Sequence, residues 1–308
     1  MTKLRLAIVG FGKIATVRHV PAIAATSGVD LVAIADPKAT SPDVPNFPSL
    51  DALLRDGPPI DAVTLCTPPQ VRGVQARLAL EAGKHVMLEK PPGGTVSEIA
   101  PLLSVAQAAK RTLFATWHSR CAPAVEPARA LLADRKIKHV TIIWREDVRV
   151  WHPGQDWIFA AGGFGVFDPG INALSILTHI LPRPVFVTRA ELGFPANREA
   201  PIVVEMDMSD AAGLPIRVEF DFRPPPPQTW DIRIETDRGP LVMSGGGAKM
   251  SDGDKVVVDA TKEEYPALYR RFVELASKGE CDVDLAPLQI VADAFLLGRR
   301  RNVEAFEF

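Results

Sequence analysis

The sequence predicts an α/β protein with two domains, and two patterns support this prediction. In residues 1–120, short runs of branched apolar residues alternate with helical stretches, which is typical of a doubly wound parallel sheet. In residues 121–308 the alternation stops. Several strand-like runs then follow one another through turns rich in proline and glycine, which favours antiparallel pairing. We therefore expect a first domain over residues 1–120 and a second, α+β domain with a mostly antiparallel sheet over residues 121–308.

The composition fits two hydrophobic cores and argues against several classes of partner. Hydrophobic residues make up 47% of the 308 residues, and 35 basic against 37 acidic residues give a net charge of −2. This balance predicts no attraction to nucleic acid or to a membrane surface. Cys66, Cys121 and Cys281 stand in no metal-ligand spacing and predict neither a metal site nor a disulfide framework. With no leader-like or membrane-spanning run, we expect a cytoplasmic protein.

The first strand, Leu4–Val9, runs directly into a glycine turn that is typical of dinucleotide binding. Residues Gly10–Ala15 read Gly-Phe-Gly-Lys-Ile-Ala, the G-x-G-x-x-G/A pattern in its expected place between a strand and a helix. Gly10 permits the tight turn, Gly12 lets the backbone approach a pyrophosphate, and Ala15 lets the helix pack closely on the strand. We predict a dinucleotide site rather than a glycine turn without a ligand, with these first members: Gly10, Gly12, Lys13 and Ile14.

The second strand, Leu31–Ala35, ends at a carboxylate that can bind a ribose. Asp36 follows Gly10 by 36 − 10 = 26 residues, close to the spacing of about 20 seen in dinucleotide sites. Its carboxylate can accept hydrogen bonds from ribose hydroxyls and would repel a 2′-phosphate, a repulsion that Lys38 softens. The sequence therefore favours NAD as the cofactor and leaves room for NADP.

Three further strands of the first domain end in polar residues. They are Asp61–Cys66, followed by Thr67 and Pro68; His85–Leu88, followed by Glu89 and Lys90; and Leu113–Thr116, followed by Trp117 and His118. Helices are expected between them, over Val71–Ala82 and Ser97–Lys110. Taken alone, Lys90 is equally well explained as a surface lysine in a turn. Because the carboxyl ends of parallel strands line the ligand crevice, we expect four of these residues near the cofactor: Thr67, Pro68, Glu89 and Lys90.

The second domain is expected to begin with a helix over Ala124–Asp134 and a strand over Lys138–Trp144. Further strands are expected near residues 185–194, 202–208, 215–223, 229–236 and 240–243, and two helices near 263–277 and 285–298. The basic run Arg299–Arg301 is interpreted as the solvated end of the last helix, where cations suit the helix dipole.

The apolar run Ala173–Ile180 predicts another helix, which begins near Asp168. In such a helix, Asp168 and Asn172 lie one turn apart on the same face. The spacing alone leaves two interpretations. Asp168 is the N-cap, with Pro169 at the first helical position. Alternatively, the Asp168 carboxylate takes a proton from a hydroxyl that the Asn172 amide orients.

A segment rich in tryptophan precedes this helix. Trp151 and Trp157 are candidates for the walls of a sugar site, because aromatic faces pack against the C–H surfaces of sugars. Glu146 and His152 lie in the same stretch and offer polar groups. The alternative is a tryptophan-containing loop packed on the core, with His152 bonded to the backbone.

The motifs of the first domain resemble those of a known family. Gly10–Ala15, Thr67-Pro68-Pro69 and above all Glu89-Lys90-Pro91 are similar to the glucose–fructose oxidoreductase and inositol dehydrogenase (Gfo/Idh/MocA) family, and the likeness spans essentially the whole chain. It implies an N-terminal Rossmann domain and a C-terminal domain on an open, mostly antiparallel sheet, through which such proteins often form homo-oligomers. It also implies hydride transfer between a nicotinamide and a hydroxyl-bearing carbon, with Lys90 touching the substrate.

One position departs from the family pattern. The family usually carries Asp-x-Gly-x-His, with the histidine as general acid and base, whereas this chain has Asn172 in its place. A side-chain amide has no pKa near neutrality and cannot act as a general acid or base. Either the redox chemistry is lost, or proton removal passes to Asp168 with the help of Lys90. We favour the second interpretation because the Glu-Lys-Pro and cofactor motifs are intact.

This variant narrows the resemblance. Asp168–Asn172, together with Ala115–Arg120 and Trp151–Gln155, resembles the bacterial aldose 1-dehydrogenases. The resemblance implies oxidation of the anomeric carbon of a pyranose, D-galactose or L-arabinose, to the aldonolactone. It also implies a set of substrate-binding residues: Lys90, His118, Glu146, His152, Asp168 and Asn172. Alternatives are another polyol or inositol dehydrogenase of the family, a relative that epimerises or cleaves glycosides, and a non-catalytic NAD-binding regulator.

Overall fold

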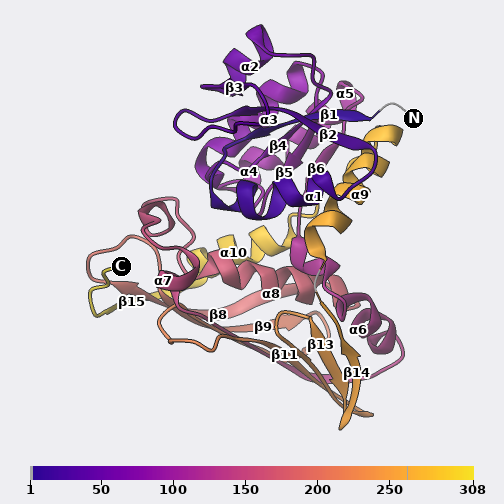
Figure 1. The fold of residues 1–308 in the computed structure, drawn as a ribbon. Helices are drawn as coiled ribbons and strands as arrows, with labels where there is room; N and C mark the ends of the chain where they lie inside the picture. The colour runs from indigo at the N-terminus through magenta and orange to yellow at the C-terminus, as the bar shows by residue number, and fades with distance from the viewer. Residues whose placement is uncertain (1–2, 262) are drawn as a thin grey trace. The chain divides into compact units, whose positions relative to one another are not determined.

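The computed structural model describes residues 3–261 and 263–308, which form two compact units (Figure 1). Unit 1 runs to His118 and takes in Glu263–Leu285, and unit 2 comprises the chain from Ser119 to the start of that segment and Ala286–Phe308. The expected division at residue 120 therefore assigned Glu263–Leu285 to the wrong domain. The chain returns to unit 1 because the backbone of Asp282 pairs with the edge strand of the sheet. The C=O of Asp282 accepts the N–H of Ala115 at 3.0 Å, and its N–H donates to the C=O of Leu113 at 3.0 Å.

Unit 1 has the architecture predicted from its alternating pattern. In its described residues, the first sheet contains six parallel strands in the order β3-β2-β1-β4-β5-β6, and helices flank this sheet (Figure 1). This is the strand order of a Rossmann fold. The strands are β1 (Leu4–Val9), β2 (Val29–Ala35), β3 (Asn46–Phe47), β4 (Ala62–Leu65), β5 (His85–Leu88) and β6 (Leu113–Ala115). The helices are η1 (Ala15–His19), α1 (Val20–Ala24), α2 (Leu50–Asp56), α3 (Pro69–Glu81), α4 (Val96–Ile99), α5 (Leu102–Ala108) and α9 (Glu264–Lys278).

The helix expected over Ser97–Lys110 is two helices, α4 and α5. Pro101 separates them and precedes the first residue of α5. A proline has no N–H to donate within a helix, which explains the break. Helix α3 contributes three fully buried residues to the core of unit 1, and they form its apolar face: Ala76, Ala79 and Leu80.

Unit 2 is built on a second, mostly antiparallel sheet, as expected. Its described strands follow the order β14-β13-β12-β11-β7-β10-β9-β8-β15, and the pairs β7–β10 and β8–β15 are parallel. The strands are β7 (Ile137–Arg145), β8 (Val185–Pro195), β9 (Val203–Asp210), β10 (Ile216–Asp221), β11 (Thr229–Thr236), β12 (Gly239–Ser244), β13 (Lys249–Asp252), β14 (Lys255–Asp259) and β15 (Arg299–Val303). The helical segments are η2 (His118–Cys121), which starts in unit 1, α6 (Val125–Leu132), α7 (Val148–Trp151), η3 (Asp156–Ile158), α8 (Phe167–Ile180) and α10 (Ala286–Leu297).

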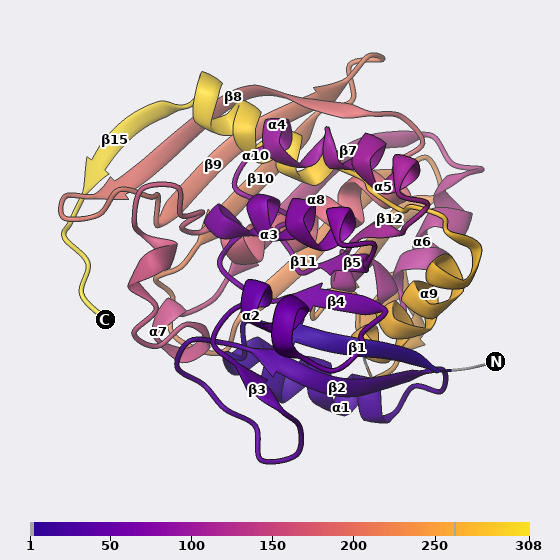
Figure 2. The same ribbon diagram turned by 90° about the horizontal axis from the view of Figure 1, so that it is seen from above.

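The end of the chain differs from the expectation. Arg299–Arg301 is not the end of a helix: α10 stops at Leu297, and these arginines begin β15, which runs along β8 at the edge of the second sheet (Figure 2). The three arginines are exposed, as expected, but they lie on a strand and not at the end of a helix. Charged side chains protect such an edge from pairing with another chain. The strands β13 and β14 were not predicted either.

Helix α8 forms the centre of unit 2. Eleven of its residues are buried, and α8 and α10 lie on the same face of the second sheet (Figure 1). Gly170 is required here, because a Cβ at this position would lie 2.5 Å from the ring of Phe220 on β10. The close approach holds the first turn of α8 against the sheet, and with it Asp168. None of the described helices is long and apolar enough to span a bilayer.

Candidate functional site

The glycine turn after β1 has the geometry that a dinucleotide site requires. Gly10 has a φ of +85°, and a Cβ there would lie 2.7 Å from the backbone nitrogen of Thr67. A side chain at Gly10 would therefore be strained and would also clash with the end of β4. A Cβ at Gly12, in contrast, would meet no atom of the described chain within 4 Å. The turn leaves room for a phosphate to approach the backbone, which fits a bound dinucleotide.

Asp36, at the end of β2, is fixed beside this turn. Its Oδ2 accepts the N–H of Phe11 at 2.8 Å, and its Oδ1 accepts the N–H groups of Lys38 and Ala39, each at 2.8 Å. Burial disfavours the carboxylate, but these three hydrogen bonds outweigh it and lower the pKa of Asp36. Oδ2 keeps a lone pair for a ribose hydroxyl. A fixed negative charge at this place suits the 2′-hydroxyl of NAD better than a 2′-phosphate.

Arg72 ties two of the predicted loops together, although no sequence motif indicated it. Its side chain is 3% exposed at the start of α3. Its guanidinium donates to the carbonyl of Thr67, at 3.1 Å from Nε, and to the carbonyls of Glu89 and Pro91. One rigid fork therefore holds the loops that follow β4 and β5. The predicted residues Thr67, Pro68, Glu89 and Lys90 are brought together through this clamp.

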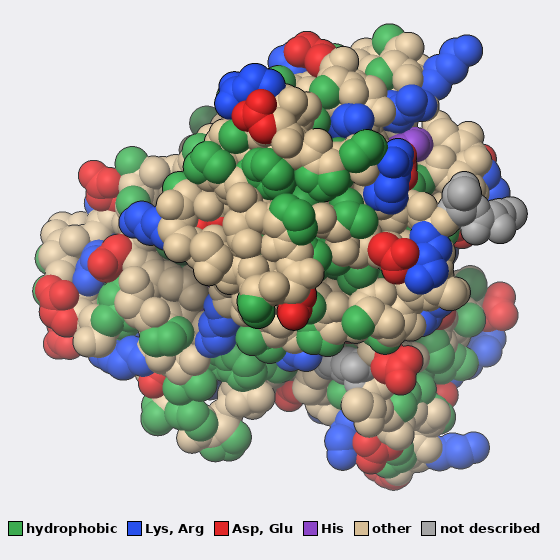
Figure 3. All heavy atoms as spheres, turned by 45° about the horizontal axis from the view of Figure 1, so that its top comes forward, with side chains coloured by type: hydrophobic (Ala, Val, Ile, Leu, Met, Phe, Trp, Pro, Cys, Tyr) green, Lys and Arg blue, Asp and Glu red, His purple; other side chains and the backbone are tan. Residues whose placement is uncertain are grey.

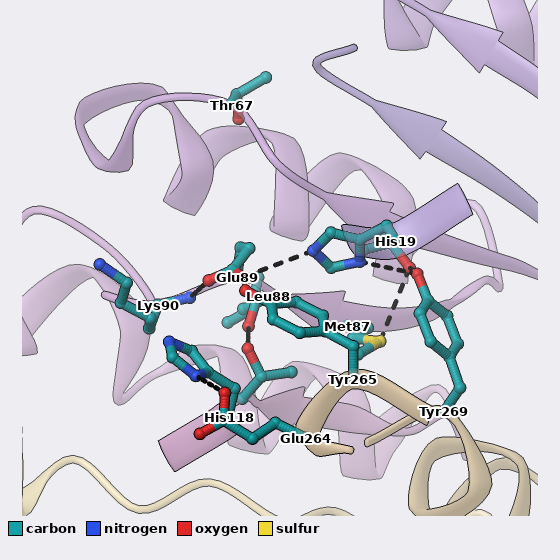
Figure 4. Close-up of polar contacts among 12 residues, drawn as sticks. His19, Thr67, Met87, Leu88, Glu89, Lys90, His118, Glu264, Tyr265 and Tyr269 are labelled. Carbon is teal, nitrogen blue, oxygen red and sulfur yellow. Dashed lines mark hydrogen bonds and ion pairs between the residues drawn. The ribbon is translucent and has the colours of Figure 1, made fainter. Parts of the chain in front are cut away.

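The carboxylate of Glu89 lies in a buried cluster, not on the open side of its loop (Figure 4). Glu89 is 2% exposed, and its Oε1 accepts the hydroxyl of Tyr265 at 2.5 Å and lies 3.4 Å from Nε2 of His19. The other ring nitrogen of His19, Nδ1, lies 2.8 Å from the hydroxyl of Tyr269. Glu89 Oε2 accepts the backbone N–H of Lys90. Both of its oxygens therefore accept hydrogen bonds from the protein, and the contact of Glu89 with the cofactor stays a prediction.

His19 and Glu89 form an ion pair. Burial favours the neutral imidazole, but Cys66, Tyr269 and Glu89 around the ring outweigh it and raise the pKa of His19 well above its usual value. Burial also disfavours the carboxylate, yet the hydrogen bond and charge of His19, with the charges of His118 and Lys90, lower the pKa of Glu89 well below its usual range. Both shifts favour the charged form of the group concerned.

His118 lies next to this cluster. Its Nδ1 is 3.0 Å from Oε2 of Glu264, and its ring stacks on that of Tyr265 with the centroids 5.3 Å apart. The ring of Tyr265 also meets the ring of His19 edge-on at 4.9 Å. The side chain of Lys90 points away from His19 and the two tyrosines (Figure 4). The chain contains only these two tyrosines, one helical turn apart on α9, and this spacing was the single sequence signal for the cluster.

In unit 2, Asp168 lies in the first turn of α8 beside His152. Its side chain is 4% exposed, and its Oδ2 is 3.5 Å from Nε2 of His152, whose side chain is 20% exposed. The N-cap interpretation was wrong: α8 begins at Phe167, and its N-cap is Val166. The turn starts earlier than expected because the N–H of Asp168 already bonds the carbonyl of Gly165 at 3.0 Å. Asn172 lies one turn further on, half-buried.

Glu146 belongs to an aromatic cluster at the end of β7. Glu146 is 4% exposed, and its Oε2 accepts the indole N–H of Trp230 at 2.7 Å. The ring of Trp230 stacks on Trp144 at 5.7 Å and meets Trp151 at 5.3 Å. The tryptophan-rich segment is therefore anchored to the sheet through Trp230, which no motif indicated. Trp157, the other predicted sugar wall, lies on η3.

The described residues contain no group of His, Cys, Asp or Glu side chains that could hold a metal ion. On the face drawn in Figure 3, Lys and Arg side chains are interspersed with Asp and Glu side chains. The glycine turn after β1 and the fixed carboxylate of Asp36 indicate a nicotinamide dinucleotide as the source of redox chemistry.

Comparison with known proteins agrees with this assignment. Residues 4–117 match the Gfo/Idh/MocA model, described as an oxidoreductase family with an NAD-binding Rossmann fold. The chain is 47% identical to a galactose 1-dehydrogenase of Pseudomonas fluorescens, over 99% of both chains. It superimposes with a TM-score of 0.95 on the crystal structure of a D-galactose-1-dehydrogenase from Rhizobium etli, with 55% identity over 100% of this chain and 99% of that one.

A more distant structure shows how far the fold extends. A 3-ketoreductase from Actinomadura kijaniata superimposes with a TM-score of 0.85 over 98% of this chain and 100% of its own, at 19% identity. This likeness shows the fold alone. The predicted α/β fold and the predicted family are confirmed by the match over the full length, and the cofactor class agrees with the family description. The chain belongs to the Gfo/Idh/MocA family of oxidoreductases with an NAD-binding Rossmann fold.

Proposed function

We propose that this protein is an NAD-dependent aldose 1-dehydrogenase that oxidises the anomeric carbon of D-galactose to the aldonolactone. The observation that carries the proposal is the buried Asp168 in the first turn of α8, with His152 at 3.5 Å and Asn172 one turn away. The similarity to two galactose 1-dehydrogenases over the full length supports the choice of sugar. L-arabinose shares the configuration of D-galactose from C1 to C4, so we include it as a second substrate.

In the proposed mechanism, Asp168 removes the proton of the C1 hydroxyl. When bound, NAD supplies the hydride acceptor, the nicotinamide C4. The electrons of the O–H bond form the C1=O bond of the lactone as the C1 hydrogen leaves with its electron pair. In this proposal Lys90 donates a hydrogen bond to the oxygen at C1 of the sugar, and the amide of Asn172 orients the C1 hydroxyl. His152 lies against Asp168 and fixes the direction of its carboxylate.

Further residues are proposed to hold the rest of the sugar. Trp151 and Trp230 offer aromatic faces for the C–H surface of the sugar. Glu146, whose carboxylate is held by the indole N–H of Trp230, accepts a hydrogen bond from a sugar hydroxyl. His118, held by Glu264, is a further candidate. For the cofactor we propose the turn at Gly10 and Gly12 with Lys13, Ile14 and Asp36, and the loops of Thr67, Pro68 and Lys90. Asp36 favours NAD over NADP.

Initial rates with a panel of aldoses, each with NAD and with NADP, test this proposal. We expect reduced nicotinamide to accumulate with D-galactose and NAD, at a lower rate with L-arabinose, and not with inositols. Accumulation also separates the enzyme from an epimerising or glycoside-cleaving relative, which returns its hydride to the substrate. Binding of NAD without turnover of any aldose would instead identify the non-catalytic regulator and contradict the proposal.

We also infer a homodimer or a higher homo-oligomer that forms through the outer face of the second sheet. In the described chain, α8 and α10 cover the other face, and the outer face carries paired charges such as Arg217–Glu205 at 3.3 Å. Light scattering of Arg217→Glu, with Arg77→Glu at an exposed position of α3 as control, should show a smaller particle for the first variant only.

We propose the cytoplasm as the location of the protein, because the cysteine pattern suits a reducing compartment. Cell fractionation tests this.

A further inference from the structure

Glu89 opens the Glu89-Lys90-Pro91 motif, yet its side chain is engaged by His19 and Tyr265 inside unit 1. Stability alone does not explain such a buried ion pair. Moving two charges out of water is costly, and apolar residues of the same volume commonly stabilise a fold at least as well. The pair therefore needs another reason, and its place directly behind Lys90 suggests one.

The contacts of the cluster converge on the backbone around Lys90. Glu89 Oε2 accepts the N–H of Lys90, while Arg72 binds the carbonyls of Glu89 and Pro91 on either side. The peptide groups that flank Lys90 are thus fixed by one buried anion and one buried cation. The side chain of Lys90 leaves this frame in the direction away from His19 (Figure 4).

One branch of hydrogen bonds in the cluster stays buried along its whole length. From His19 the hydrogen bonds lead to the hydroxyl of Tyr269, then at 3.3 Å to Thr64, whose hydroxyl faces the sulfur of Met87 at 3.7 Å. Tyr269, Thr64 and Met87 are fully buried, and a thioether cannot pass a proton on. This branch therefore ends inside the protein, and the effect that we infer for the cluster is on geometry and charge.

We propose that His19 and Tyr265 are positioning residues, which hold the Glu89 carboxylate as a fixed anion that orients Lys90 toward the sugar. The inference rests on the proposed function of Lys90 and extends it to a residue pair contributed by η1 and by the returning helix α9. Tyr265 comes from a segment 176 residues further along the chain than Glu89 (265 − 89 = 176). The segment Glu263–Leu285 would then return to unit 1 to complete the site, besides covering the sheet edge.

The two tyrosines provide a matched comparison. Both are buried on α9, but Tyr265 donates to Glu89 directly, whereas the hydroxyl of Tyr269 lies beside His19 and Thr64. We expect Tyr265→Phe to lower kcat with D-galactose by about tenfold or more, since a hydrogen bond to a charged group is lost next to Lys90. We expect a smaller loss for Tyr269→Phe and an unchanged Kd for NADH in both variants. Arg271→Gln, which removes exposed ion pairs of an arginine on the same helix, is the control and should keep full activity. Equal effects of the two tyrosine variants, or full kcat in Tyr265→Phe, would overturn the proposal.

A double variant separates positioning from stability. His19→Gln leaves the buried Glu89 carboxylate without its cationic partner and should lower the Tm strongly. Adding Glu89→Gln removes that charge and should restore most of the Tm. Because no anion then faces Lys90, we expect kcat to stay at least about tenfold below that of the wild type. Recovery of kcat together with the Tm would show a purely structural role and contradict the inference.

A readout without cofactor or sugar keeps this inference distinct from the proposed function. The rate of reductive methylation of Lys90, followed by mass spectrometry on the apoprotein, reports its orientation and surroundings. We expect this rate to change severalfold in Tyr265→Phe and to stay at the wild-type value in Arg271→Gln. If the wild type oxidises no aldose, the proposed function fails while the labelling result still decides the inference. If the wild type is active and neither labelling nor kcat responds to Tyr265→Phe, the inference fails alone.

Discussion

Two buried carboxylates, one in each unit, show how different the surroundings of similar groups can be. Glu89 and Asp168 have side chains that are 3% and 4% exposed, and each lies within 3.5 Å of a histidine nitrogen. The partner of Glu89, His19, is 0% exposed and sits among two tyrosines, whereas the partner of Asp168, His152, is 20% exposed on a loop. Burial and a nearby histidine therefore do not by themselves identify a catalytic base. In the proposed mechanism, the accessible histidine belongs to the carboxylate that meets the sugar, and the enclosed histidine belongs to the carboxylate that the protein holds.

The largest effect expected from this comparison concerns Asp168. Asp168→Asn keeps the size of the side chain and removes the base, so kcat with D-galactose should fall by about a thousandfold, within the range known for general bases. The Tm should change little. Asp51→Asn, an exposed aspartate in the first turn of α2, is the matched control and should keep full kcat. If the Asp168→Asn variant turns over at nearly the wild-type rate, another residue is the base and Asp168 is not catalytic.

The second effect is on stability in acid and concerns Glu89. Because its pKa is lower in the folded protein than in the unfolded chain, its contribution is present above the unfolded value of about 4 and is lost as the pH falls. Urea titrations at pH 7 and about pH 3 should show a loss on the order of 2 kcal/mol from this group, because the unfolded carboxyl is fully protonated only well below its pKa. The loss should be smaller in the His19→Gln/Glu89→Gln variant. An identical pH dependence in both proteins would show that Glu89 is not held as an anion.

A third carboxylate, Asp36, extends the comparison to an anion fixed by backbone N–H groups. Asp36→Ala should raise the Kd for NAD by about tenfold, the equivalent of about 1.4 kcal/mol, because the ribose loses its acceptor. The Kd for NADP should change less or fall, because the repulsion of the 2′-phosphate is removed. Fluorescence titration with the reduced cofactors measures both values. Equal weakening of the two cofactors would show that Asp36 acts only on the shape of the turn.

The smallest effect is spectroscopic and reports on the Glu89 cluster without any variant. Burial, and then the Glu89 charge, raises the pKa of Tyr265 well above its usual value, and burial raises that of Tyr269. A raised folded pKa stabilises the protein fully below the unfolded value of about 10, and this contribution is lost as the pH rises through the folded value. Tyrosinate absorbance should therefore appear only with alkaline unfolding, in one cooperative step. Titration of either tyrosine in the folded protein would contradict the closed cluster.

Much of the first unit followed from local sequence. The apolar runs predicted the strands and their order of appearance, and the turn at Gly10 and the carboxylate of Asp36 predicted the cofactor class. These features are readable because each depends on neighbours within a few residues: a positive φ after a strand, or a carboxylate at a strand end. The helix that breaks at Pro101 was missed, although proline is itself a local signal.

Local sequence by itself determined the α/β class, the class of cofactor and the placement of Asp168 and Asn172 one turn apart on a helix. Only the tertiary structure decided that Glu263–Leu285 returns to unit 1, that Arg299–Arg301 forms an edge strand, and that Glu89 meets His19 and Tyr265. The physical reason is range. Periodicity and turn chemistry are set by adjacent residues, whereas a hydrogen bond between Tyr265 and Glu89 exists only because packing brings distant segments of the chain together.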